Sequence, residues 1–358
     1  MVANLTTRLG QLTSSPAGGP YTGANKIING DMVIDQRNAG ASVTPSAGGY
    51  SVDRMRCALS AASKYTVQQD GGSLTAPAGA THWACVVSSS SYSLSAGDYF
   101  AFEQFIEGQN IADLNWGTAN AKTVTLSFLV QSTLTGTFGG SLENSASNRS
   151  YPFTYTISTA NTWEQKSITV AGDTSGTWLT TTGIGIRVQL GLGVGTTYSG
   201  TAGAWAAADY LSATGAVSVV STSGAKLAIT NLKLEVGSIA TPFVPDDYQV
   251  SLGKCQRYYR KIIYAASSWW GAGAAWGTGN AGSGMTWSPT MRAAPTVTLP
   301  STINWDNTTG GAIASVTTTV TVIGLDNFRL SGTAASGWVA GNATLIEFTG
   351  NLVMDAEL

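Results

Sequence analysis

The sequence predicts an all-β protein built from a jelly-roll β-sandwich, a second, smaller C-terminal β-sandwich and a short N-terminal leader. Charged residues make up 11% of the 358 residues, well below the roughly 25% of ordinary soluble proteins. The Glu, Lys and Arg that favour long surface helices are therefore scarce. The 43 glycines, with abundant Thr, Ser, Val and aromatic residues, suit short strands joined by tight turns. A chain of this length has room for two or three domains.

The leader comprises residues 1–24. Residues 4–12 have the composition of one or two helical turns, and residues 14–23 form a Pro/Gly/Ser linker. Two roles remain open for this segment. It is either a mobile tail or a peptide that anchors the chain to a larger assembly, in which case the anchoring residues would be Asn4, Leu5, Leu9 and Leu12.

Residues 25–245 are predicted to form the jelly roll. The segment 26–37 reads as an opening strand interrupted by an Asn-Gly-Asp turn. The segment 225–236 reads as the closing strand, because apolar and polar residues alternate along it. Between them, strands are expected at residues 64–68, 83–87, 98–106, 123–132, 150–158, 163–170, 182–192 and 216–220.

A hinge and a second β-domain follow. Pro242 and Pro245 prevent the closing strand from continuing, and a helix-like run over 249–260 predicts a hinge with a short helix at 246–261. Residues 262–358 are expected to form the C-terminal β-domain. Strands are predicted there at 312–323, 327–331 and 343–354 from alternation and β-branched content.

Charge, cysteines and hydropathy exclude several classes of protein. The net charge of −2, without a cluster of Lys and Arg, argues against nucleic-acid binding. Cys57, Cys85 and Cys255 form no CxxC pair, so buried free thiols are expected rather than a zinc site or a disulfide. There is no secretion-signal pattern and no apolar run of membrane-spanning length, which predicts synthesis in a cytoplasm and no membrane insertion.

Several short sequence segments resemble segments of proteins from tailed bacteriophages. Residues 105–110, 114–117, 121–128, 148–151 and 172–178 are similar to a sandwich module of phage tail-fibre and minor structural proteins. Residues 255–259, 291–297 and 354–358 extend the resemblance. It implies a tail protein of the virion, made in the host cytoplasm, that forms a homotrimer, contacts other virion proteins and binds a bacterial surface polysaccharide for adsorption.

The strand pattern also resembles carbohydrate-binding modules and galactose-binding-like sandwiches. In those modules, acidic residues of the opening and closing strands often hold a structural calcium ion. Here the matching position of the closing strand is Asn231. This difference argues against calcium, and no cofactor is expected.

The C-terminal tryptophans are the best candidates for a glycan contact. Pyranose rings pack their C–H faces on aromatic rings, and the run 269–277 combines tryptophans with glycines that let a ligand approach the backbone closely. The alternative is that these rings fill a core or a subunit interface. The predicted glycan-binding residues are Trp269, Trp270, Trp276 and Trp287.

Catalysis is not expected. His82 is the single histidine, and the chain lacks a Gly-x-Ser-x-Gly elbow. Glu103 and Glu107 share a strand face, but about 13 Å between residues four apart is too far for the usual carboxylate pair of a glycosidase. A capsule depolymerase is accordingly kept only as the second alternative function. The first alternative is a purely structural virion component, such as a head-decoration fibre or an adaptor.

Overall fold

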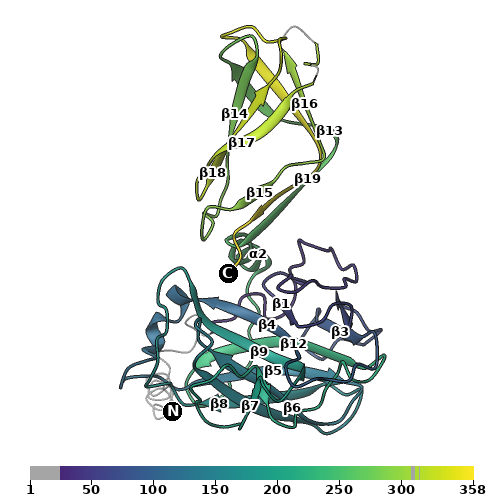
Figure 1. Ribbon diagram of the computed structural model, residues 1–358, viewed down its shortest axis with the longest axis vertical. Coiled ribbons are helices and arrows are strands. Elements are labelled where there is room, and N and C mark those ends of the chain that lie inside the picture. The colour runs from purple at the N-terminus through teal and green to yellow at the C-terminus, as the bar shows by residue number, and fades with distance from the viewer. Residues whose placement is uncertain (1–24, 308–310, 314) are drawn as a thin grey trace, which may run out of the picture. The chain divides into compact units, whose positions relative to one another are not determined.

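The computed structural model describes residues 25–307, 311–313 and 315–358, and its elements are almost all β-strands (Figure 1). The all-β prediction is confirmed. Internal contacts divide the chain into a first unit that ends at Ser251 and a second unit, Leu252–Glu357. The division falls inside helix α2 (Tyr248–Gln256), within the predicted hinge. Among the described residues, no helix is both long and apolar enough to cross a membrane.

The first unit is a sandwich of two five-stranded sheets. Every neighbouring pair in both sheets is antiparallel. One sheet, called the pocket sheet below, has the order β1 (Arg56–Leu59), β4 (Tyr99–Glu107), β9 (Ile184–Val194), β6 (Gly136–Glu143), β7 (Ser150–Ile157). The other has the order β2 (Tyr65–Gln69), β3 (Ala84–Ser88), β12 (Lys226–Val236), β5 (Val124–Ser132), β8 (Glu164–Val170). The chain crosses repeatedly from one sheet to the other, and only β2–β3 and β6–β7 are consecutive strands within one sheet. This arrangement of two packed antiparallel sheets is the predicted jelly roll.

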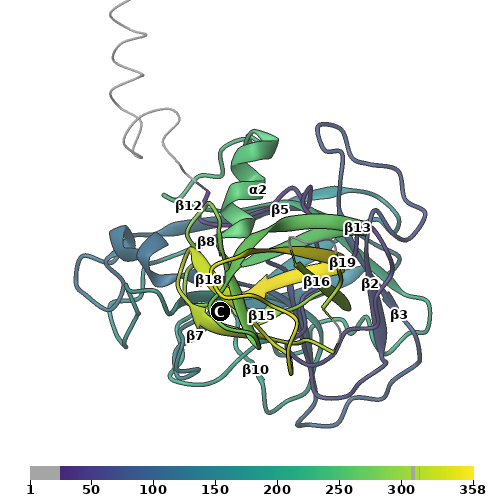
Figure 2. The same ribbon diagram turned by 90° about the horizontal axis from the view of Figure 1, so that it is seen from above.

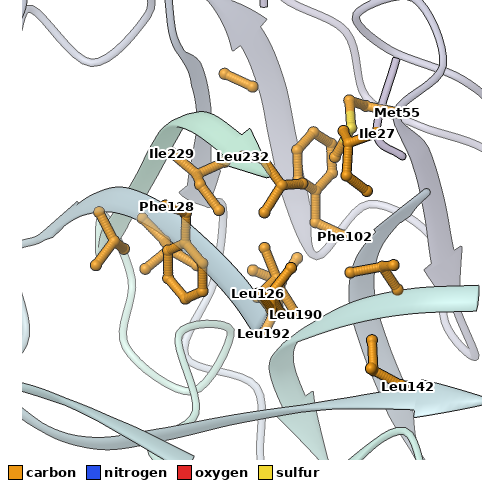
Figure 3. Close-up of a cluster of buried hydrophobic side chains, with 14 of the residues drawn as sticks. Ile27, Met55, Phe102, Leu126, Phe128, Leu142, Leu190, Leu192, Ile229 and Leu232 are labelled. Atoms are coloured by element: carbon orange, nitrogen blue, oxygen red, sulfur yellow. The ribbon is translucent and has the colours of Figure 1, made fainter. Parts of the chain in front are cut away.

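The core of this unit lies between the two sheets. Along β4, Phe100, Phe102 and Ile106 point inward, and they meet the inward side chains of β5, such as Leu126 and Phe128 (Figure 3). Full burial of each such side chain contributes roughly 1.5–3 kcal/mol. The alternation sends the intervening residues of β4 to the outer face of the pocket sheet, where the candidate site lies.

The three cysteines are buried and free, as predicted. Burial is the largest cause that raises the pKa of Cys57 to about 12 and that of Cys85 to about 11. The thiols are therefore uncharged at neutral pH and serve as small apolar side chains.

The predicted opening strand is wrong, because residues 26–37 form turns rather than a ladder. Asn29 has a left-handed backbone (φ 59°), and its side chain bonds Ile34 and the carbonyl of Asp53. Gly30 lies against β12, where a Cβ would come within 2.0 Å of the Leu232 carbonyl oxygen. At that point β12 is itself irregular, with Asn231 left-handed (φ 51°) in a bulge. The left-handed backbone of Asn231 is therefore part of the bulge in β12.

The predicted and observed strands of the first unit differ at two further places. The predicted strand over 216–220 is irregular chain, although Val219 and Val220 are fully buried. Conversely, β6 carries three glycines and was not predicted. Short elements complete the unit: η1 (Gly108–Asn110), η2 (Ala112–Leu114) and the parallel pair β10 (Ser199–Gly200) and β11 (Ser212–Ala213).

The second unit is one curled antiparallel sheet of seven strands around its own core. Its order is β15 (Thr296–Thr298), β19 (Ala343–Asp355), β13 (Tyr259–Ala275), β14 (Asn280–Thr286), β18 (Asn327–Thr333), β17 (Thr317–Ile323), and β16 (Thr302–Asn307) also pairs with β19. β19 lies between β13 and β16 (Figure 2). The core is rich in aromatic residues and includes Trp305, Phe328, Trp338 and Phe348.

Candidate functional site

The outer face of the pocket sheet carries three rows of side chains that run across the strands. The first row is small: Ala58 on β1 pairs with Ala101 on β4, which pairs with Gly191 on β9. The second row is polar and consists of Arg56, Glu103, Gln189 and Ser141. The third row consists of Phe105, Arg187, Glu143 and Ser150. The register thus gathers charges from four strands onto one surface.

The first row is covered by a segment of the chain that we call the covering loop (residues 198–213). A Cβ on Gly139 would lie 2.4 Å, and one on Gly191 2.7 Å, from the Ser212 hydroxyl oxygen. Glycine at these two positions therefore lets the loop lie directly on the sheet. Leu211 of the loop also packs on Ala58 and Ala101.

The second row forms a hydrogen-bonded floor. The guanidinium Nη1 of Arg56 donates a short, charge-assisted bond to Glu103 Oε1. Next to this pair, the Ser141 hydroxyl donates to Gln189 Oε1 at 2.9 Å, and Gln189 Nε2 donates to Glu143 Oε2 at 3.0 Å. Burial raises the pKa of Glu103, and the Arg56 charge opposes that rise. The floor is therefore a buried network in which Arg56 stabilises the carboxylate.

Arg187 fixes one side of the site. Its Nη1 donates to the Ser147 hydroxyl at 2.7 Å and reaches Glu143 Oε2 at 3.5 Å, and its Nη2 donates to the Ser145 carbonyl at 3.0 Å. Arg56 and Arg187 both lie over the ring of Phe105, at 4.8 and 5.3 Å from its centroid. The two side chains remain about a quarter exposed (26% and 23%), so they combine fixed positions with access from solvent.

Glu143 is the second buried carboxyl group of the site. It is fully buried, and its Oε1 finds no N–H or O–H donor within the described part of the chain. Burial, and then hydrogen bonding and charge repulsion from the Asp209 carboxylate, raise the pKa of Glu143 to about 8. The protonated form of Glu143 is therefore favoured at neutral pH beside Asp209 of the covering loop.

Together these groups enclose a cavity of about 310 Å³. Tyr99 and Tyr198 form an aromatic wall, with ring centroids 5.4 Å apart in an edge-to-face arrangement. The volume is at the small end of the roughly 300–1,000 Å³ typical of ligand pockets. Aromatic walls over a polar, charged floor suit a small ligand with many hydroxyl groups. Sequence reasoning noticed Glu103 but missed the pocket, because its residues meet only through strand register.

The predicted tryptophan site has a different structure from that expected. Residues 269–275 belong to strand β13 rather than to a loop, because Gly273 lets β14 approach so closely that a Cβ would lie 2.3 Å from the Gly282 carbonyl oxygen. Trp269 and Trp270 are thus on β13, and their side chains lie outside the description. Trp276 is 52% exposed, lies against Gly282 and has the Arg329 guanidinium 5.6 Å from its centroid.

Trp287 is a core residue, which is the alternative to ligand binding that the sequence left open for these tryptophans. It is 8% exposed, packs on Phe328 and donates its indole N–H to the Leu325 carbonyl at 3.2 Å. Its ring has no free face for a glycan, so we correct that assignment. The anchoring residues Asn4, Leu5, Leu9 and Leu12 lie outside the described residues.

The remaining candidates for chemistry are dispersed. His82 Nδ1 lies 2.7 Å from Asp70 Oδ2 at the surface. Glu107 is buried on β4. Within residues 25–307, 311–313 and 315–358, no group of three or more His, Cys, Asp or Glu side chains is arranged to hold a metal ion.

Comparisons with family models and with curated proteins gave no match. Solved structures to which the chain is similar include the enzymatically active domain of tailspike protein 4 from bacteriophage CBA120, at 12% identity and a TM-score of 0.32, covering 60% of this chain and 22% of that one. A structure described as CBM4 has 14% identity and a TM-score of 0.29, covering 58% and 98%. A family 11 carbohydrate-binding module from Clostridium thermocellum, in complex with a β-1,3-1,4-mixed-linked tetrasaccharide, has 10% identity and a TM-score of 0.28, covering 56% and 98%.

Proposed function

We propose that this chain is a non-catalytic tail-fibre or spike protein of a phage virion that binds a bacterial surface glycan. The observation that carries the glycan-binding part is the pocket on the outer face of the pocket sheet. The Arg56 and Arg187 guanidiniums and the Asp209 carboxylate supply partners for sugar hydroxyls, and the tyrosine wall supplies apolar surface for ring C–H groups. The proposed place in a phage virion rests on the short sequence segments that resemble tail-fibre proteins.

Trp276 remains a second candidate contact on the other unit. Its exposed indole, held between Gly282 and Arg329, is a fixed aromatic surface of the kind that packs on a pyranose ring. The two candidate sites share no residue, so substitutions at Tyr198 and at Trp276 test them separately.

The test is binding of the full-length protein to a printed array of bacterial surface glycans and to host cells. Loss of a stacking ring costs on the order of 1–3 kcal/mol by analogy with base stacking. Tyr198→Ala should therefore weaken binding about tenfold or more, whereas Tyr198→Phe, which keeps the ring, should retain most of it. Trp276→Ala is the matched change in the second unit. If Tyr198→Ala binds as tightly as the wild type and melts at the same temperature, the pocket is not the glycan-binding site.

A depolymerase is the second candidate, favoured by one observation. Glu143 and Glu103 line the same pocket, and a pair of carboxyl groups is what glycosidases use. Burial raises the pKa of both groups, and only Glu103 has an Arg56 guanidinium as its hydrogen-bond partner to oppose that rise. Their near-complete burial argues against it, because an acid must reach the glycosidic oxygen. Incubation with each bound polysaccharide, followed by assay of new reducing ends, decides between binding and cleavage. If the wild type releases new reducing ends and Glu143→Gln does not, the protein is an enzyme.

A further inference from the structure

The pocket is closed on opposite sides, and this limits the part of a glycan that it can admit. On one side the covering loop lies on Gly139 and Gly191 and packs Leu211 against Ala58 and Ala101. The backbone N–H of Leu211 donates to the Tyr198 carbonyl at 2.8 Å, which holds the two branches of the loop together. A chain of sugars cannot leave in that direction without displacing the loop.

The opposite side is bordered by Arg187 and Glu143, which line the pocket at the third row. Arg187 donates to the Ser145 carbonyl and the Ser147 hydroxyl of the turn after β6, so this turn fixes the position of the guanidinium. The two barriers thus lie at the two ends of the polar floor, along the strand direction.

A third side is closed at β7. Ser150 and Ala206 exchange backbone hydrogen bonds of 2.8 and 3.0 Å, and the Ser150 hydroxyl donates to the Ala208 carbonyl at 2.8 Å. Asp209, the next residue, contacts Glu143. The covering loop is therefore bonded to the far edge of the pocket sheet as well as resting on its middle.

The fourth side, at β1, is bordered by a segment that is hydrogen-bonded to this strand: Gly48 N–H donates to the Cys57 carbonyl at 2.9 Å, and Cys57 N–H donates to the Gly49 carbonyl at 2.8 Å. Ala47 and Gly48 line the pocket there beside Arg56, and Ala47 is exposed at its mouth. Gly48 is left-handed (φ 74°), and a Cβ there would lie 2.7 Å from Arg56 Nη2, so glycine gives the guanidinium space. A floor bordered on every side and a volume of about 310 Å³ describe a socket rather than a groove.

We propose that the pocket binds the terminal sugar residue of a glycan chain and does not accept the same residue inside a chain. This inference rests on the proposed glycan-binding function. A groove open at both ends would bind a chain along its length, and its affinity would rise with each added sugar. A socket gains little beyond the one or two residues that it encloses.

The test uses arrayed glycan pairs in which one sugar is either terminal or capped by a further residue, together with calorimetry on the matching mono- to tetrasaccharides. We expect capping to weaken binding by at least tenfold, and affinity to stop rising after the first or second sugar. Ala47→Trp, at the exposed mouth, should abolish binding. Ala119→Trp, at an exposed alanine that does not line the pocket, is the matched control and should not.

The outcomes separate the inference from the function on which it rests. Equal binding of capped and terminal sugars, or an affinity that grows steadily to the tetrasaccharide, would overturn chain-end recognition and leave glycan binding intact. Full binding by folded Ala47→Trp would overturn the position of the mouth. A folded wild-type protein that binds neither the array nor host cells would overturn the proposed function itself.

Discussion

Replacing Glu143 by Gln tests the raised pKa of the buried carboxyl group in the pocket. The substitution keeps the size of the side chain and its acceptor for Gln189 but removes its titration. Because burial and Asp209 raise the pKa of Glu143 above its ordinary value, the folded unit binds this proton more tightly than the unfolded chain does. The stabilisation is fully present below the ordinary pKa of the group and is lost as the pH rises through the folded-state pKa.

The size of the effect follows from the two pKa values. The interval from the ordinary 4.5 to about 8, at 1.36 kcal/mol per unit, corresponds to at most about 5 kcal/mol in the free energy of unfolding. The measured change in the free energy of unfolding between low and high pH should not exceed this bound. Asp53, whose pKa burial raises to about 6, titrates in both proteins and cancels in the comparison.

The assay is urea denaturation of wild type and Glu143→Gln between about pH 5 and about pH 9, with the unfolding of the first unit followed by circular dichroism. The wild type should lose its advantage over the variant as the pH rises. Glu164→Gln is the control, because the hydrogen bond from Lys166 lowers the pKa of Glu164, and its effect is confined to more acidic solutions. If wild type and Glu143→Gln depend on pH in the same way, the raised pKa of Glu143 is refuted.

Three further predictions address assembly and the interior. Light scattering of the purified chain should give three times 36.9 kDa if the proposed homotrimer forms, and a monomer would contradict it. Deleting residues 1–23 should leave folding and glycan binding intact but abolish incorporation into particles, and truncated protein found in virions would place the anchor elsewhere. Ellman's reagent should react with Cys57, Cys85 and Cys255 only after denaturation, because all three are buried, whereas a rapidly reacting thiol in the native protein would show that a core opens.

The strands that sequence alone predicts well are long and rich in apolar and β-branched residues. The predicted ranges for β4, β5 and β12 agree with the structure to within one residue at each end, and these strands have 9 to 11 residues, most of them buried. β6 was missed because its glycines read as turns, and their reason is the covering loop, which is distant in sequence. The same non-locality hid the pocket: Glu103 and Glu143 meet through the register of β4, β9 and β6, which no local pattern contains.

The tryptophan-rich segment shows the opposite error. Glycines beside tryptophans suggested a loop, but Gly273 serves close strand packing inside β13. Composition correctly identified an aromatic-rich unit and correctly left open whether its rings bind or pack. It could not divide them, because Trp276 and Trp287 each follow directly after a strand and differ in what covers them, which leaves 52% of one and 8% of the other exposed.

The pairing of Tyr259 with Asp355 brings the first and last strands of the second unit together at one end of the β13–β19 ladder. The two ends of this unit therefore lie next to each other, and the ladder runs from them to the pairing of Ala274 with Ala343 at its other end. Substitutions and insertions in the turns at that far end, such as the turn that carries Trp276, can change the exposed surface without moving either end of the unit.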